Sequence, residues 1–189
     1  MAASVGGTMN VRLSVLLVVV LAFIGGFIYF SQFGRASKPL EDRPLFYRVN
    51  PDDIVHISIR HEDKQVAFKK VDTAKWVFDN PEETPVNPDR FSGTTYLLSG
   101  PRAERLSAEN VEDPSIYGLE PPKSVVEVTL RDGRTFRFHF GDKNPAGDLI
   151  YARFDDDPRV FLITSSWSDV LIRLATEPPT PTPEPEATP

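Results

Sequence analysis

The fold is decided by one stretch, SVVEVTLRDGRTFRFHFG, at residues 124–141. Its apolar side chains occupy every second position in both halves: Val126, Val128, Leu130, Phe136, Phe138 and Phe140. Apolar residues at this spacing, separated by polar ones, indicate strands with one buried face. Asp132-Gly133 lies between the halves and supplies the left-handed backbone angles of a tight turn. The stretch therefore predicts an antiparallel β-hairpin.

More strands are expected before this hairpin. Two runs alternate apolar with polar residues, and their apolar positions are Val55, Ile57, Ile59, Val66 and Phe68. A polar turn at 61–64 separates them, so they predict a second hairpin, and Trp76–Phe78 predicts a third strand.

A helix is expected next. Asn87 is placed to cap it, with Pro88 at the first helical position, where a missing N–H costs nothing. Gly100-Pro101 ends the helix, and its apolar face carries Phe91, Thr95 and Leu98. The segment 106–122 is expected to be irregular.

Strands and a final helix are expected after the hairpin. A loop at 141–148 leads to strands at 150–154 and 160–163, joined by a tip at 155–158. Ser166 and Asp169 resemble a capping box for the closing helix. One face of this helix carries Trp167, Val170, Leu171 and Leu174.

The N-terminal part has a different composition. Leu13 to Phe30 is an apolar run without a charged residue. At about 1.5 Å per residue a helix extended through Phe33 spans a hydrocarbon core of about 30 Å. We predict a transmembrane anchor at 13–33, between a short N-terminal tail at 1–12 and a linker at 34–44. A cleaved signal peptide is the alternative, because small residues flank Arg35.

The predicted fold class is α+β: an antiparallel β-meander with one or two short covering helices, preceded by a single transmembrane helix. The domain at 45–174 is long enough to bury one core. Residues 175–189 form a Pro/Thr-rich tail, which is expected to be disordered and extended. A rigid spacer, a glycosylation target and a ligand for an aromatic groove are alternative roles for this tail.

Charge and cysteine content exclude several functions. All 27 acidic residues of the chain, and all but one of its 21 Lys and Arg residues, follow the apolar run. The resulting acidic domain argues against nucleic acid and against anionic lipid as partners. The chain has no cysteine, so disulfides, thiol catalysis and thiolate metal sites are excluded.

No residue is assigned as catalytic, cofactor-binding or metal-binding. His56, His61 and His139 are the conventional borderline-metal ligands, but no third or fourth ligand converges on them, and solvent-facing strand positions explain them. The run 155–157 lacks the ligand spacing of a calcium loop and is interpreted as a hairpin tip. The loop at 141–148, with Asp142 and Lys143, is the longest between predicted strands and is where a binding site is expected.

One ordered set of motifs resembles a known family, the domain of unknown function 4340 family. The set is Trp76, Tyr117-Gly118-Leu119-Glu120-Pro121, Asp132-Gly133, Phe140-Gly141 and Tyr151. The resemblance covers roughly Ile54 to Leu174 and implies a bacterial or archaeal protein with one N-terminal helix and a domain outside the cytoplasm. It also implies proximity to ABC-type motility or export components. It implies no catalytic residues, and Tyr117-Gly118-Leu119 is interpreted as a packing corner.

The resemblance also bears on orientation. Arg35, Lys38 and Arg43 outnumber Arg12, which by the positive-inside rule favours a cytoplasmic domain, but the N-terminal amine offsets this bias. The placement implied by the family therefore decides for an extracytoplasmic one.

The leading functional hypothesis is a non-enzymatic, single-pass protein of the cell membrane. It presents an extracytoplasmic interaction domain to a protein partner, a component of an ABC-type transport or envelope assembly. One alternative is a small-ligand or glycan sensor in which Tyr151 and nearby aromatic residues provide a stacking surface. The other is a hydrolase that uses His56, His139 or Asp142.

Overall fold

The computed structural model describes residues 11–33 and 42–181, and in the first range it describes the side chains of residues 15–27. These residues fall into two units, the N-terminal helix and the domain that follows the linker. Residues 1–10, 34–41 and 182–189 lie outside the described residues, so most of the predicted N-terminal tail and linker and the end of the predicted proline-rich tail lie there too.

The N-terminal unit is the helix α1, Val11–Phe33. Every side chain described in it, from Val15 to Phe27, is exposed. Among the residues whose side chains are described, no helix has both the length and the apolar character needed to span a membrane.

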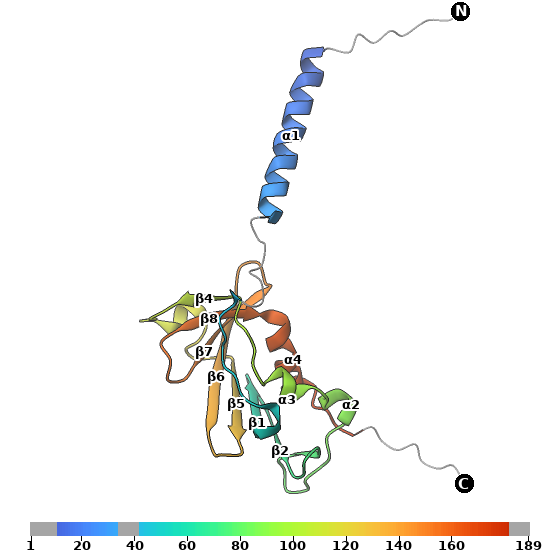
Figure 1. Cartoon of the computed structure of the whole chain (residues 1–189), viewed down its shortest axis with the longest axis vertical. Helices are drawn as coiled ribbons and strands as arrows, with labels where there is room; N and C mark the ends of the chain where they lie inside the picture. Colours follow the sequence, from blue (N-terminus) through green and yellow to red (C-terminus); the bar gives the residue numbers. More distant parts are fainter. Residues whose placement is uncertain (1–10, 34–41, 182–189) are drawn as a thin grey trace, which may run out of the picture. The chain divides into compact units, whose positions relative to one another are not determined.

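The domain is built on one antiparallel sheet with the strand order β3-β2-β1-β5-β6-β7-β8-β4 (Figure 1). Its strands are β1 (Ile54–His61), β2 (Lys64–Lys70), β3 (Trp76–Phe78), β4 (Arg105–Ala108), β5 (Ser124–Leu130), β6 (Thr135–Lys143), β7 (Leu149–Phe154) and β8 (Val160–Thr164). The helices described in the domain are η2 (Pro51–Asp53), α2 (Pro88–Phe91), α3 (Thr94–Leu97), η3 (Pro114–Tyr117) and α4 (Ser165–Thr176). The predicted α+β class with an antiparallel sheet is confirmed.

The predicted central hairpin is β5–β6. Val126 lies opposite Phe138 and Val128 opposite Phe136, which is the register expected from the alternation. Gly133 has φ +87° and its N–H donates to the Leu130 carbonyl at 2.9 Å, so the predicted turn forms, but Gly133 and not Asp132 takes the left-handed angle.

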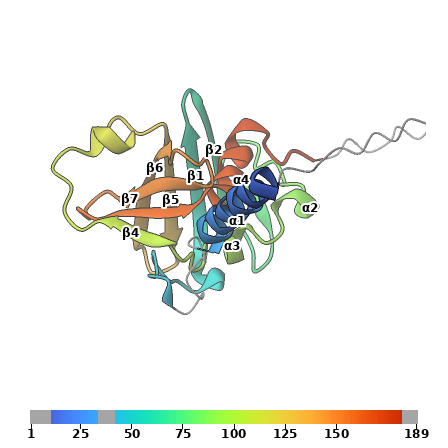
Figure 2. The same ribbon diagram turned by 90° about the horizontal axis from the view of Figure 1, so that it is seen from above.

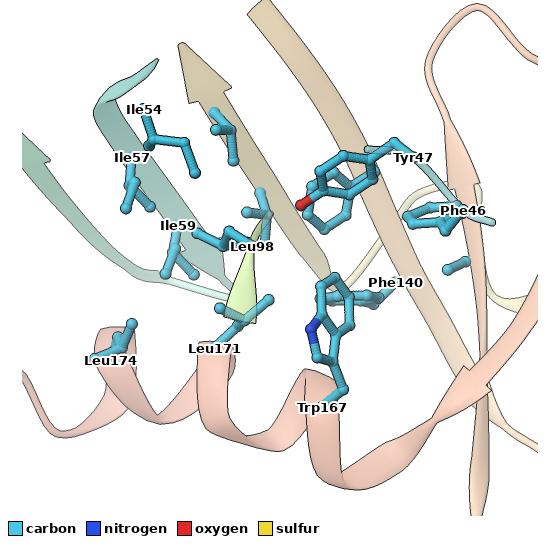
Figure 3. Packing of buried hydrophobic residues seen from close by; sticks show 14 of the residues in the cluster. Phe46, Tyr47, Ile54, Ile57, Ile59, Leu98, Phe140, Trp167, Leu171 and Leu174 are labelled. Carbon is cyan, nitrogen blue, oxygen red and sulfur yellow. The ribbon is translucent and has the colours of Figure 1, made fainter. Parts of the chain in front are cut away.

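One face of the sheet is buried beneath α4, which packs against β1, β2, β7 and β8. Trp167, Leu171 and Leu174 project from α4 toward the sheet (Figure 3). The Trp167 ring stacks on Phe138 with centroids 5.7 Å apart, and its indole N–H donates to the Leu97 carbonyl at 3.0 Å. This bond ties α4 to the end of α3.

The segment that enters the domain completes the core. Phe46 and Tyr47 are buried, and both rings lie near Phe138, with centroids 5.6 and 5.7 Å away. The Tyr47 hydroxyl has no hydrogen-bond partner among the described residues, and burial raises its pKa. The phenol therefore stays protonated.

The predicted helix after Asn87 is wrong in its length. The Asn87 side chain accepts from the backbone N–H of Asp89 at 3.0 Å, so the cap is confirmed. The helix breaks at Gly93, whose φ of +82° is left-handed, and α3 restarts after it. The break changes the helical phase, so Thr94 is buried in place of the predicted Thr95.

The predicted start of the final helix is also wrong. α4 begins at Ser165 with Thr164 as a cap that makes no side-chain hydrogen bond, so Ser166 and Asp169 form no capping box. Asp169 instead pairs with Lys143 at 3.2 Å. Val170 is 46% exposed, and Ser168 takes its predicted place in the buried face.

Three features of the strands also differ from the prediction. A register shift between Ile54 and His56 places Ile54, not Val55, in the core. β6 continues to Lys143, so the loop begins at Asn144 and not at Gly141. The segment expected to be irregular contributes β4, which pairs with β8 at the edge of the sheet, where Leu106 lies opposite Phe161.

The buried face of α4 predicts that two adjacent residues contribute differently to the free energy of unfolding. Leu171→Ala should lower the free energy of unfolding by about 2–5 kcal/mol, because Leu171 is fully buried against the sheet. Val170→Ala, at an exposed neighbouring position, should change it by less than about 1 kcal/mol. Urea unfolding followed by circular dichroism measures both, and equal losses would contradict the described orientation of α4.

Candidate functional site

The candidate site lies on the face of the sheet away from α4. Part of this face is covered by the segment between β4 and β5. Leu119 of this segment is fully buried, and so is Leu162, which lies opposite Tyr151 in the β7–β8 pair. That segment, yellow-green in Figure 2, lies on the side of the domain opposite α2. Over β1, β5 and β6 the face carries partly exposed polar side chains.

The register brings charged residues from four strands together. Arg60 lies opposite Val125, Val125 opposite His139, and His139 opposite Arg153. In the neighbouring row, Glu127 lies opposite Arg137. With Asp155 at the end of β7, these residues form a surface that we name the charged face: Arg60, Glu127, Arg137, His139, Arg153 and Asp155.

Ion pairs hold the centre of the charged face. The Arg137 Nε lies 2.9 Å from a Glu127 carboxylate oxygen, and its Nη1 lies 3.3 Å from Asp155. Both carboxylates raise the pKa of Arg137, with Glu127 having the larger effect. Arg60 and Arg153 have no hydrogen-bond or ion-pair partner among the described residues, and the Arg153 Nε is buried. Of these two, Arg60 lines a shallow hollow of about 410 Å³ and is exposed, whereas Arg153 is partly exposed and lies outside that lining.

His139 is partly buried on the charged face, and its pKa lies below the ordinary value. Burial lowers its pKa, Asp155 acts in the opposite direction, and Arg153, Arg137 and Arg60 lower it further. Its Nε2 lies 2.8 Å from the Asp155 carboxylate, while its Nδ1 is buried without a partner. A general base needs a nitrogen within reach of the substrate. In this structure Nε2 faces Asp155 and Nδ1 is buried, so His139 links β6 to Asp155.

The other predicted candidates lie apart from His139. His56 contacts Asp79 at 3.2 Å, and His61 contacts the Ser124 hydroxyl at 2.7 Å. The His56 hydrogen bond lowers the pKa of Asp79, with Lys69 acting in the same direction. In the described parts of the chain no three or more histidine or acidic side chains are grouped to hold a metal ion.

The predicted binding loop is held by Lys123 and by a hydrogen bond within the loop. Asp142 lies 3.0 Å from the Lys123 ammonium, and the Asn144 amide donates to Asp148 at 2.9 Å. The structure does not bring His56, His139 and Asp142 together. The tip at 155–158 is a turn, as predicted, and Asp157 there binds the Arg159 guanidinium.

The Tyr117-Gly118-Leu119 corner packs directly on β6. Gly118 has φ +67°, and a Cβ on it would lie 2.6 Å from the Asp142 carboxyl carbon. A Cβ on Gly141 would lie 2.0 Å from the Tyr117 carbonyl oxygen. Two glycines thus permit a backbone contact that no other residue allows. The Tyr117 ring lies 4.8 Å from the ring of Tyr151, the residue proposed for ligand stacking, and both are partly exposed.

The chain matches one family of known proteins. The family model described as "Domain of unknown function (DUF4340)" matches residues 76–176, more than half of the chain. The chain belongs to this family. The match begins at Trp76 and ends at the last residue of α4, so β1 and β2 lie outside it. No curated protein and no solved structure matches the chain.

Sequence reasoning missed the arginines of the charged face. Arg60, Arg137 and Arg153 occupy outward positions of strands whose alternation is readable in the sequence. Their proximity depends on the order and register of β1, β5, β6 and β7, which alternation does not reveal. An arginine at an outward position in three separate strands was the available signal.

The environment of His139 predicts a pH effect. Its pKa in the folded chain lies below the ordinary value of 6.5, so the unfolded chain takes up a proton first as the pH falls. The contribution of His139 to the free energy of unfolding should therefore have its full value above pH 6.5. It should decrease as the pH falls below 6.5, and the decrease should end below the pKa of the folded chain. Asp155→Asn removes the negative charge that opposes this shift and should lower the pKa further. An NMR titration of the imidazole tests this, and a pKa above 6.5 would contradict it.

The glycine contact predicts a second stability difference. Gly141→Ala should lower the free energy of unfolding by about 3 kcal/mol or more, because its Cβ would overlap the Tyr117 backbone. Gly100→Ala is the matched control: its nearest neighbour would be 3.6 Å away, and it should cost less than about 1 kcal/mol. Thermal unfolding of both variants tests this prediction. A Gly141→Ala variant as stable as the unchanged protein would show that the Tyr117-Gly118-Leu119 corner does not pack on β6.

Proposed function

We propose that the chain is a single-pass protein of the cell membrane that presents its domain outside the cytoplasm to a protein partner. The partner is a component of an ABC-type transport or envelope assembly, as the resemblance of the motifs suggested. One observation carries the interaction role: the charged face is partly exposed, and two of its arginines have no partner among the described residues.

The anchor is supported by the composition and exposure of α1. No charged residue lies between Leu13 and Phe33, and the side chains of residues 15–27 are exposed and mostly apolar. Apolar side chains without a protein surface to cover them are stable in lipid. An anchor confines the domain to the membrane surface, which raises its effective concentration for a partner in the same membrane.

The charged face favours an acidic partner surface. Arginine is enriched at protein interfaces because its planar guanidinium binds a carboxylate through two parallel hydrogen bonds. Arg60 is exposed and Arg153 partly exposed, and both lie in one row across the sheet. The chain as a whole carries a net charge of −6, whereas this row carries positive charge. A partner with an acidic surface therefore has one preferred docking position on the domain.

Crosslinking in intact membranes tests the proposal. The full chain, carrying a tag, should recover transport or envelope subunits, and Arg60→Glu should reduce the recovery at least tenfold by placing a like charge against the acidic partner. Arg173→Glu is the control: it makes the same charge change on an exposed position of α4. Equal recovery with both variants would exclude the charged face as the contact.

A second arm of this experiment tests the topology. Protease added to intact spheroplasts should digest the domain, because the proposal places it outside the cytoplasm. Full protection of the domain, with digestion only after lysis, would contradict the proposed orientation.

A further inference from the structure

A second surface lies on the opposite side of the sheet, next to α2. It is a groove of about 930 Å³ between the turn that joins β2 to β3 and the helices α2 and α3. We name it the α2 groove, and its lining includes Trp76, Phe91, Tyr96, Pro85, Val86 and Pro88. Trp76 and Phe91 belong to the core, and their rings lie 5.4 Å apart. The aromatic wall of the groove is therefore rigid.

The lining suits a polyproline helix. Grooves lined by aromatic side chains bind proline-rich segments, because the flat rings pack against pyrrolidine rings that are already held in an extended helix. Tyr96 is 72% exposed at the edge of the α2 groove. Its hydroxyl is a donor for the carbonyl groups that a polyproline helix leaves unpaired.

The chain already holds a proline-rich segment beside this groove. The Arg90 guanidinium donates to the Glu177 carbonyl at 2.8 Å and to the Pro178 carbonyl at 3.1 Å. The Asn87 N–H donates to the Pro179 carbonyl at 2.8 Å, and Pro179 is buried. Asn87 stands between two residues that line the α2 groove, so the segment is fixed at the border of the groove.

The residues that follow have the composition and the length to occupy it. Residues 182–189 read TPEPEATP, and at about 3.1 Å per residue they reach about 25 Å as a polyproline helix. Lys75 in the lining is exposed and has no ion-pair partner among the described residues, and Glu184 and Glu186 would supply the opposite charge.

We propose that the α2 groove is a polyproline-binding site and that residues 182–189 of the same chain occupy it. The attachment at Asn87 and Arg90 keeps these residues at an effective concentration of about 1 mM. A proline-rich segment of another protein must displace them to bind. This proposal does not depend on the membrane anchor or on the charged face.

Peptide binding to two chains tests the proposal. The chain of residues 1–189 is compared with a shortened chain of residues 1–181, both in lipid nanodiscs, and the probe is a fluorescent peptide with the sequence of residues 180–189. The shortened chain should bind the peptide. For a Kd of about 0.1 mM, the full chain should bind about tenfold more weakly, because its own residues 182–189 compete.

Variants and a second peptide make the test specific. Tyr96→Ala should abolish binding by the shortened chain, while Ile116→Ala should not, because Ile116 is similarly exposed but lies outside the α2 groove. A peptide with alanine in place of every proline should not bind to either chain. Urea unfolding of each variant checks that the domain is intact.

Three results would overturn the proposal. If the shortened chain does not bind the peptide, the α2 groove is not a polyproline site. If both chains bind equally, residues 182–189 are not its occupant. If the full chain is dimeric and the shortened chain is monomeric by light scattering, the occupant comes from a second copy and not from the same chain.

Discussion

The contact of the Phe138 ring with the rings around it is the interaction on which the rest of the domain depends. Phe46 and Tyr47 approach it from the entering segment, Phe154 from β7 and Trp167 from α4. The sheet supplies Phe138 and Phe154, and the rings that cover them come from two distant parts of the chain, the entering segment and α4. Because Trp167 also donates to the Leu97 carbonyl, the same contact fixes α3, and through it one wall of the α2 groove.

Burying one face of the sheet determines the chemistry of the other. Strand residues point alternately to the two sides, so each apolar position in β1, β5 and β6 places its neighbours on the far side. Those neighbours include Arg60, Glu127 and Arg137, and cross-strand pairing neutralises only part of their charge. The charged face is thus a consequence of the core pattern, and Arg60, which is exposed and without an ion-pair partner among the described residues, distinguishes it from a surface that is fully paired.

The sequence predicts what depends on local pattern. The β5–β6 hairpin and the Asn87 cap follow from side chains within a few residues of each other, and both are confirmed. β4 was missed because its strand is defined by pairing with β8, more than fifty residues away. Gly93 breaks a helix that periodicity alone would continue. His56 and His139, two of the histidines weighed as metal ligands, are separated by β5, and each contacts its own carboxylate.

The two proposed binding surfaces lie on opposite sides of one sheet. The binding free energy at one surface is therefore expected to be independent of binding at the other. Trp76 and Phe91 of the α2 groove belong to the core beneath α4, whereas Arg60 and Arg137 project from the other face. Residues that share no contacts contribute independently to stability and binding. A partner can therefore occupy the charged face while a proline-rich segment occupies the α2 groove, and either surface can lose its ligand without changing the other. Together the two proposals describe an adaptor, in which one sheet separates two proposed recognition surfaces of different chemistry.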